Sequence, residues 1–309
     1  MYFENLNWVW GANVNITIHN VEQVYRNNSH ALYPVDLEFH EGVYGLLGPN
    51  GAGKSTLMNI LTMAKKPTSG TVYCNGVDIN TIQNEYKSRI GYLPQTFGLF
   101  PALSGREFLM YVAALKGLSK RHAAGRIQEL LSALNLNEVG DQHIASYSGG
   151  MRQRIGIAQA LLNNPKFLLL DEPSVGLDPD ERVNLKNLIT KAAQDATVIY
   201  STHIVSDIEA LAGNIIIMKQ GRILAAGAVN QLTEPVEGLV WKMNVDYSGL
   251  ATLQDKYICS SSSRSSDGIE VRVLSSTPPS AGAEPVYPTL EDVYLYLIHQ
   301  DKIKGESPA

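Results

Sequence analysis

The sequence has few cysteines, no long apolar run and no excess of basic charge, and each absence excludes a class of protein. Two cysteines, Cys74 and Cys259, are too few for a disulfide framework, so a reducing compartment is expected. Neither has a cluster of histidines or cysteines beside it, so we assign neither a metal or catalytic role. No apolar run approaches the roughly 20 residues that a membrane-spanning helix needs. A net charge of -5 gives no general attraction to nucleic acid or anionic lipid.

The sequence also opens without a secretory signal, because MYFENLNWVW has no basic region ahead of an apolar core. Since no apolar run is long enough to span a bilayer, we expect another chain to supply the spanning part if the protein works at a membrane. The aromatic residues of this opening either pack on the domain or touch a membrane interface. What the sequence does have is an ordinary globular composition, 44% hydrophobic and 18% charged, in 309 residues. That length is enough for one large or two modest domains.

Short apolar runs alternate with helical spacing up to about residue 230, which is typical of an α/β domain. Several of the runs end in polar residues, as strands buried in a parallel sheet do. Ser104 and Glu107 form a capping-box pattern at the start of one helix. The expected elements are strands at 14–25, 35–39, 43–47, 90–95, 166–173 and 196–203, a helix after residue 54, and helices at 104–117 and 120–134.

After residue 230 the character of the chain changes, which predicts a small α+β appendage over 231–309. It contains two strand-like runs, a helical stretch and a closing amphipathic helix from Leu290. The serine-rich run 260–266 is predicted to be a flexible loop, and the Pro/Gly-rich stretch 277–288 a linker.

The stretch GLLGPNGAGKSTLMNIL places a glycine-rich loop between a strand and a helix. Gly48 to Ser55 fits G-x-x-x-x-G-K-[ST] in the context that this phosphate-binding motif requires. Glycines allow backbone amides to turn toward phosphate oxygens, and the helix N-terminus adds partial positive charge. Lys54 is then expected to bridge the terminal phosphates and Ser55 to hold magnesium.

Three further motifs follow in a fixed order. They are SYSGGMRQR at 146–154, KFLLLDEP at 166–173 and SVGLDPD at 174–180, with His203 beyond them. Together with the phosphate loop they resemble the ATP-binding-cassette (ABC) ATPases over residues 14–230. The resemblance implies a P-loop NTPase cassette, with a parallel-sheet core, an antiparallel β subdomain and a helical subdomain at about 96–160. Residues 1–13 are then an N-terminal extension.

The resemblance assigns chemistry to four residues. Asp171 and Glu172 follow a buried strand, so they are expected at the carboxyl edge of the sheet, where ligands bind. Asp171 would hold magnesium through water, and Glu172 would be the general base for the attacking water. Gln95 would sense magnesium and water, and His203 would contact the γ-phosphate and align Glu172.

The resemblance also assigns the ATP contacts. Tyr25 matches the adenine-stacking aromatic, with Tyr33 as the other candidate and an ordinary strand tyrosine as the alternative. The expected ATP-binding residues are Tyr25, Gly48, Pro49, Asn50, Gly51, Ala52, Gly53, Lys54, Ser55, Thr56, Ser148, Gly149, Gly150 and Asp178.

The signature segment YSGGM departs from the commoner LSGGQ at both ends but keeps Ser148, Gly149 and Gly150. Because it opens a helix, its amides form a second anion site. In the family this site faces the nucleotide of the opposite subunit, and Asp178 lies in the loop that links the two sites. The resemblance therefore implies a head-to-tail dimer, homomeric or heteromeric.

Finer features resemble ATPase subunits of bacterial drug, lipid and antibiotic exporters, which pair with a membrane permease at the cytoplasmic face of the membrane. The features are YGLLGPNGAGKST, YSGGMRQR, SVGLDP and PTLEDVYLYLI. Peptide, ion, haem or polysaccharide cargo would give nearly the same sequence. The resemblance also implies that the apolar loop 96–103 would receive the permease. An importer ATPase, or a non-transport cassette acting on a soluble partner, is the alternative.

Overall fold

The structure is a computed structural model that describes residues 14–266 and 268–300. Contacts divide the chain into two compact units, Met1–Ile223 and Leu224–Ala309. The domain boundary expected near residue 230 and the expected limits of the subdomains stay predictions. The aromatic opening, residues 1–13, lies outside the described residues. No helix in the described part of the chain is both long and apolar enough to span a bilayer.

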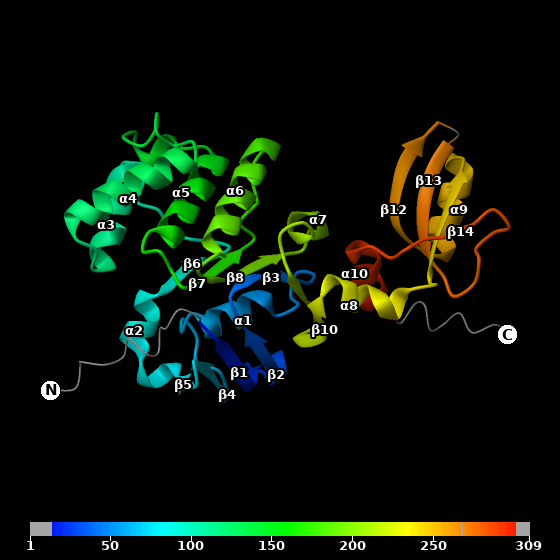
Figure 1. Ribbon diagram of the computed structural model, residues 1–309, viewed down its shortest axis with the longest axis horizontal. Helices are drawn as coiled ribbons and strands as arrows, with labels where there is room; N and C mark the ends of the chain where they lie inside the picture. Colours follow the sequence, from blue (N-terminus) through cyan, green and yellow to red (C-terminus); the bar gives the residue numbers. More distant parts are fainter. Residues whose placement is uncertain (1–13, 267, 301–309) are drawn as a thin grey trace. The chain divides into compact units, whose positions relative to one another are not determined.

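A six-stranded sheet forms the centre of the first unit, in the order β10-β9-β3-β8-β7-β6 (Figure 1). β3, β6, β7, β8 and β9 pair in parallel, and β7 and β8 are buried along their whole length because both faces are covered. A two-residue turn, Gln220 and Gly221, joins the last two strands, and both residues have positive φ (48° and 75°), as expected for a tight hairpin. The strands are β3 (Gly42–Leu47), β6 (Ile90–Leu93), β7 (Phe167–Asp171), β8 (Thr197–Thr202), β9 (Asn214–Lys219) and β10 (Arg222–Ala228).

The register of this sheet places the expected polar residues at one edge. Leu47, the last residue of β3, pairs with Thr202 of β8, and Asp171 of β7 pairs with Ser201. The phosphate loop, the acids after β7 and the histidine after β8 therefore leave the sheet side by side at its carboxyl edge.

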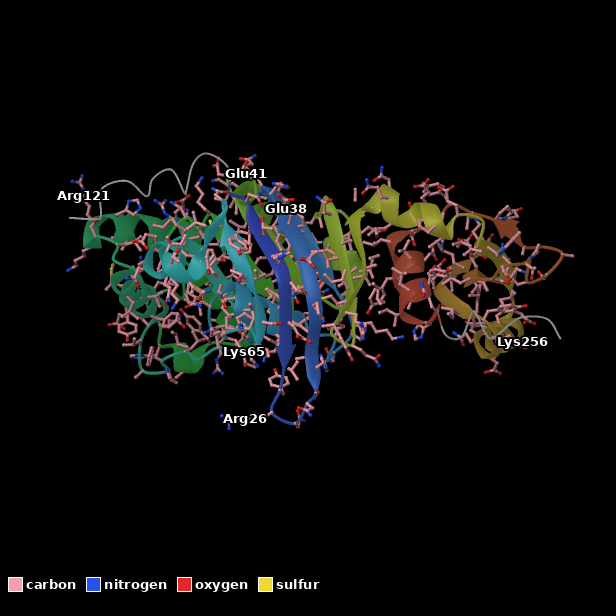
Figure 2. All side chains as sticks on the ribbon, turned by 90° about the horizontal axis from the view of Figure 1, so that it is seen from below. Arg26, Glu38, Glu41, Lys65, Arg121 and Lys256 are labelled. Carbon is pink, nitrogen blue, oxygen red and sulfur yellow. The ribbon has the colours of Figure 1, made fainter. Side chains whose placement is uncertain are left out.

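An antiparallel sheet, in the order β2-β1-β4-β5, lies on the other side of helix α1 (Lys54–Leu61), as Figure 1 shows. One hydrophobic core joins the two sheets through α1 and contains Ile16, Phe39, Leu57 and Phe167, all fully buried. Figure 2 shows Arg26 at the turn between β1 and β2, and Glu38 and Glu41 toward the opposite ends of these strands. The strands are β1 (Ile16–Val24), β2 (His30–Phe39), β4 (Ser69–Cys74) and β5 (Val77–Asp78).

Helices α3, α4 and α5 pack on one another next to β6, the edge strand of the six-stranded sheet (Figure 1). The predicted capping box is present at the start of α3, where Ser104 Oγ accepts from the Glu107 amide and the Glu107 carboxylate accepts from the Ser104 amide. The α-helices of the first unit besides α1 are α2 (Gln83–Ser88), α3 (Gly105–Leu115), α4 (Lys120–Ala133), α5 (Gly149–Leu161), α6 (Pro179–Ala192) and α7 (Val205–Ile208).

The second unit is a small α+β domain around a four-stranded sheet, in the order β12-β13-β11-β14. Its core contains Met243, Leu253, Ile269, Val271 and Val273. The elements are α8 (Val229–Thr233), β11 (Val240–Val245), α9 (Tyr247–Lys256), β12 (Ile258–Ser265), β13 (Gly268–Leu274), β14 (Glu284–Pro285) and α10 (Leu290–Ile298).

The serine-rich run is not the flexible loop that the sequence predicted, because most of it forms β12. Antiparallel pairing with β13 runs from Ile258 opposite Leu274 to Ser265 opposite Gly268. The backbone ladder satisfies the chain, and an edge strand tolerates exposed hydroxyls. The buried Ser260 also donates to Asp292 in α10, which ties the strand to the closing helix.

Asp292 is the polar centre of this unit. It is fully buried, pairs with Arg272 at 2.5 Å and accepts from the Thr289 amide at 2.7 Å. Burial favours the neutral acid, but the bonds from Arg272, Ser260 and Thr289 outweigh burial, so the pKa of Asp292 is lowered.

Candidate nucleotide site

The loop between β3 and α1 has a shape that only glycines allow. Gly51 and Gly53 have φ of 79° and 102°, and a Cβ on Gly53 would lie 2.7 Å from the Ala31 carbonyl oxygen. A Cβ on Gly48 would lie 2.5 Å from the carbonyl oxygen of Met218. Helix α1 begins without a side-chain cap and without an acidic residue in its first turn. Its amino-terminal amides are therefore available to an anion.

Lys54 places its ammonium inside this loop. The side chain is buried, and Nζ donates to the carbonyl oxygen of Gly48 at 2.5 Å and lies 3.9 Å from Glu172 Oε1. Burial lowers the pKa of Lys54, while the charges of Glu172 and Asp171 raise it. The two carboxylates thus offset only part of the cost of burying the Lys54 ammonium, and a bound phosphate would supply further negative charge beside it.

Asp171 is buried at the end of β7 and offers one unused oxygen. Ser201 Oγ donates to Asp171 Oδ1 at 2.8 Å, whereas Oδ2 is buried without a hydrogen-bond partner. A buried carboxylate oxygen without a donor is costly unless a cation or its bound water uses it. The residues present therefore fit Mg²⁺, a cation that binds few carboxylates and completes its shell with water and phosphate oxygens.

Glu172 follows in a strained conformation. Its φ is 51°, in the left-handed region, and its carboxylate is buried. Oε1 lies 2.9 Å from His203 Nδ1, and Thr202 Oγ1 donates to Oε2 at 3.4 Å. The His203 side chain is half exposed, so the buried Glu172 carboxylate has a partner that solvent or a ligand can reach.

These groups share one cavity of about 600 Å³. It contains residues 49–56 of the loop, both acids and Gln95, the residue expected to sense magnesium. His203 does not line the cavity and contacts it only through the Glu172 carboxylate. Ser29, His30 and Ala31 also line it, although no sequence motif points to this part of the antiparallel sheet. The lining residues are Tyr25, Ser29, His30, Ala31, Pro49, Asn50, Gly51, Ala52, Gly53, Lys54, Ser55, Thr56, Gln95, Asp171 and Glu172.

The two tyrosine candidates differ in position. Tyr25 lines the cavity and is 44% exposed, with Lys65 Nζ 3.9 Å from its ring centroid. Hydrogen bonds from Lys65 and Thr56 lower the pKa of its phenol. Tyr33 does not line the cavity, and its ring stacks on His30 and under the guanidinium of Arg222. The open position of Tyr25 favours it for stacking on a base.

The signature residues lie away from this cavity. Ser148 caps α5 by accepting from the Met151 amide, and Ser148 and Gly149 are exposed. Tyr147, where the sequence departs from the commoner motif, is buried, and its hydroxyl donates to the Val139 carbonyl. Asp178 caps α6 by accepting from the Glu181 amide, which is a structural role at an exposed position.

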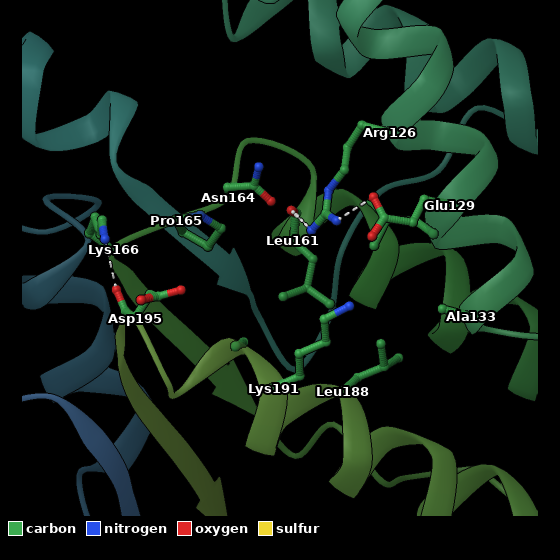
Figure 3. Close-up of a pocket in the computed structure, with 12 residues that line it drawn as sticks. Arg126, Glu129, Ala133, Leu161, Asn164, Pro165, Lys166, Leu188, Lys191 and Asp195 are labelled. Atoms are coloured by element: carbon green, nitrogen blue, oxygen red, sulfur yellow. Dashed lines mark hydrogen bonds and ion pairs between the residues drawn. The ribbon is translucent and has the colours of Figure 1, made fainter.

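A second cavity of about 470 Å³ lies at the opposite end of the strands (Figure 3). Lys166 precedes β7 and Asp195 precedes β8, so this cavity is at the amino edge of the sheet. Figure 3 shows Arg126 reaching from α4 to Glu129 and to the Leu161 carbonyl. It has neither the glycine loop nor the acids of the nucleotide site.

Comparison with known proteins settles the family. Residues 32–175 match the family described as ABC transporter. The chain is 36% identical over 243 residues to the uncharacterized ABC transporter ATP-binding protein YxlF of Bacillus subtilis, covering 78% of this chain and 80% of that protein. This chain belongs to the ABC transporter ATP-binding proteins. The expected resemblance is confirmed.

Other relatives of this ABC protein share its cassette. The linearmycin resistance ATP-binding protein LnrL of Bacillus subtilis is 36% identical over 63% of each chain. ABC transporter A family member 8 of Arabidopsis thaliana is 37% identical, but the match spans only 21% of that longer protein. A dimeric bacterial ABC transporter cassette superposes with a TM-score of 0.64 at 29% identity, covering 69% of this chain and 98% of that one. The P-loop cassette fold is confirmed, and the chain is an ATPase of the type that powers transport.

Proposed function

We propose that this ABC protein is the ATP-hydrolysing subunit of an exporter whose membrane permease is a separate chain. The observation that carries the proposal is the carboxylate of Glu172, which is buried between His203 at 2.9 Å and Lys54 at 3.9 Å in the cavity of the phosphate loop. This arrangement has a base, a phosphate-binding cation and a partner for the base, which are the elements of water activation.

Nucleotide binding is the first step of the proposed mechanism. The phosphates would lie on the amides of residues 48–56, with Lys54 exchanging its carbonyl contacts for phosphate oxygens. Ser55, Asp171 and Gln95 would hold Mg²⁺, which when bound offsets phosphate charge. Tyr25 would stack on the adenine.

Hydrolysis needs a proton acceptor beside the attacking water. Glu172 would accept that proton, since it lines the cavity and its ion-pair partners there, Lys54 and His203, would turn to the phosphates when ATP binds. His203, bonded to the same carboxylate, would fix its orientation and reach the γ-phosphate from the exposed side.

A second cassette would complete the site. Ser148, Gly149 and Gly150 stand at the start of a 13-residue helix outside this chain's own cavity, and the first two are exposed. An anion site on an open surface fits a nucleotide held by another subunit, with Asp178 in the loop between the two sites. The partner is a second copy or a related cassette, arranged head to tail.

Export is supported by LnrL, whose name assigns it to linearmycin resistance. A drug, lipid, antibiotic or peptide is the proposed cargo, and the cytoplasmic face of the membrane is the proposed location. The permease would dock near residues 96–103, where Phe100 is 49% exposed and its ring packs on Tyr111, itself 46% exposed. An apolar surface of this kind fits a protein partner.

Affinity purification from detergent-solubilised membranes of the source cells tests the assignment. We expect a multi-span membrane protein to co-purify with the tagged chain, and vesicles containing the complex to take up cargo at the ATP-binding face and release it at the other. Transport of cargo toward the ATP-binding face would favour the importer alternative. Recovery with ribosomes or DNA alone would contradict the proposal and favour a non-transport cassette.

A further inference from the structure

Helix α5 holds the backbone at Glu172 through one side chain, Gln153. Its Nε2 donates to the carbonyl oxygen of Glu172 at 3.3 Å and to that of Pro173 at 3.1 Å. Two carbonyl oxygens can only accept, so the amide nitrogen of Gln153 must face them. Both hydrogens of this nitrogen are therefore used on the turn that follows β7.

The turn needs such support because Glu172 adopts a conformation that a residue with a side chain rarely takes. Its φ of 51° persists only where surrounding bonds determine the backbone. The Glu172 amide donates to the Ser201 carbonyl at 2.9 Å, which fixes the turn on the side of β8. Gln153 fixes the carbonyl side from the opposite direction.

Two further contacts join α5 to the same segment. A Cβ on Gly150 would lie 2.9 Å from the carbonyl oxygen of Gly176, so the two backbones touch there. Arg154 pairs with Glu181 at 2.8 Å, and both side chains are largely buried. The first half of α5 is therefore packed directly against the segment 172–181.

We propose that Gln153 is a positioning residue for ATP hydrolysis: it holds the strained turn so that the Glu172 carboxylate stays directed into the nucleotide cavity. This inference rests on the proposed function of Glu172 as the base. Ser148 caps the same helix, α5. A nucleotide held by the opposite subunit and bound at Ser148 would therefore contact the helix that positions this chain's own base.

The test uses the full-length protein with Gln153→Met, which removes the donor and keeps the shape, and Gln153→Glu, which places an acceptor against the carbonyls. We expect kcat for ATP to fall about tenfold in each, with KM within twofold, because the phosphate loop is untouched. Gln159→Glu is the matched control, since Gln159 lies on the same helix and donates to the Tyr92 carbonyl. It should keep kcat within twofold, and the melting temperatures of all variants should agree closely.

A double-mutant cycle separates positioning from general damage. In single-turnover measurements, Gln153→Met should slow the Glu172→Gln variant less than twofold, since the base that it positions is already gone. An equal tenfold loss in both backgrounds would overturn the proposal. Unchanged kcat in Gln153→Met, in an enzyme that Glu172→Gln does inactivate, would also overturn it and leave the proposed function standing. Full turnover in Glu172→Gln would instead show that Glu172 is not the base, and would contradict the proposed function.

Discussion

Glu172→Gln is expected to separate ATP binding from hydrolysis. Glutamine has nearly the same shape, and its carbonyl oxygen can still accept from His203 Nδ1, now 2.9 Å from Glu172 Oε1. What disappears is the proton acceptor and one negative charge 3.9 Å from Lys54 Nζ. That charge raises the pKa of Lys54 against the opposing effect of burial, but a bound phosphate would replace it.

The magnitude follows from the role of a general base, which typically contributes about 10²–10⁴-fold. Turnover should therefore fall at least about a hundredfold, or about 2.7 kcal/mol of activation free energy. The affinity for ATP should stay within a few fold, and an ATP-bound dimer should accumulate because the nucleotide is no longer removed.

Three measurements check this: steady-state ATPase rate, equilibrium ATP binding, and mass by light scattering with and without ATP. Glu129→Gln is the matched control, because Glu129 is an exposed carboxylate paired with Arg126 at the opposite edge of the sheet. It should hydrolyse ATP at the wild-type rate. Turnover of Glu172→Gln within tenfold of wild type would show that the base lies elsewhere.

Three other changes test separate parts of the molecule. Ser148→Arg places a cation where the opposite subunit's γ-phosphate would dock, so turnover and ATP-driven dimerisation should be lost while the monomer binds ATP normally; a monomer that cannot bind ATP would contradict the two-subunit site. Phe100→Asp should weaken co-purification with the permease, since burying an unpaired carboxylate costs several kcal/mol, and Tyr247→Asp in the second unit is the control; normal transport by Phe100→Asp would exclude this docking site. Asp292→Asn should destabilise the second unit by about 3 kcal/mol in urea unfolding at neutral pH, because Arg272 loses its buried partner. Since the pKa of Asp292 is lowered on folding, its contribution is present above the ordinary carboxyl pKa and lost as the pH falls through the lowered value, so the two proteins should converge in acid and a constant gap would refute the pairing.

Local patterns in the sequence predicted much of the site, because its chemistry depends on short segments. The phosphate loop needs glycines at fixed spacing, which are recognisable whatever the rest of the chain does. Ser104 and Glu107 form their capping box between neighbours along the chain. Asp171 and His203 follow apolar runs that could be read as buried parallel strands, so a common sheet edge followed from topology.

The tertiary structure decided what depends on partners distant in sequence. The serine-rich run 260–266 lacks the apolar alternation of a strand, and pairing with β13 makes most of it one. The amide of Gln153 meets the backbone of Glu172 nineteen residues later, a contact that no residue type at either position predicts. The choice between Tyr25 and Tyr33 needed the position of each ring relative to the cavity. The sequence thus determined which groups are proposed to carry the chemistry, because their spacing is local, while packing across the chain determined how they are held.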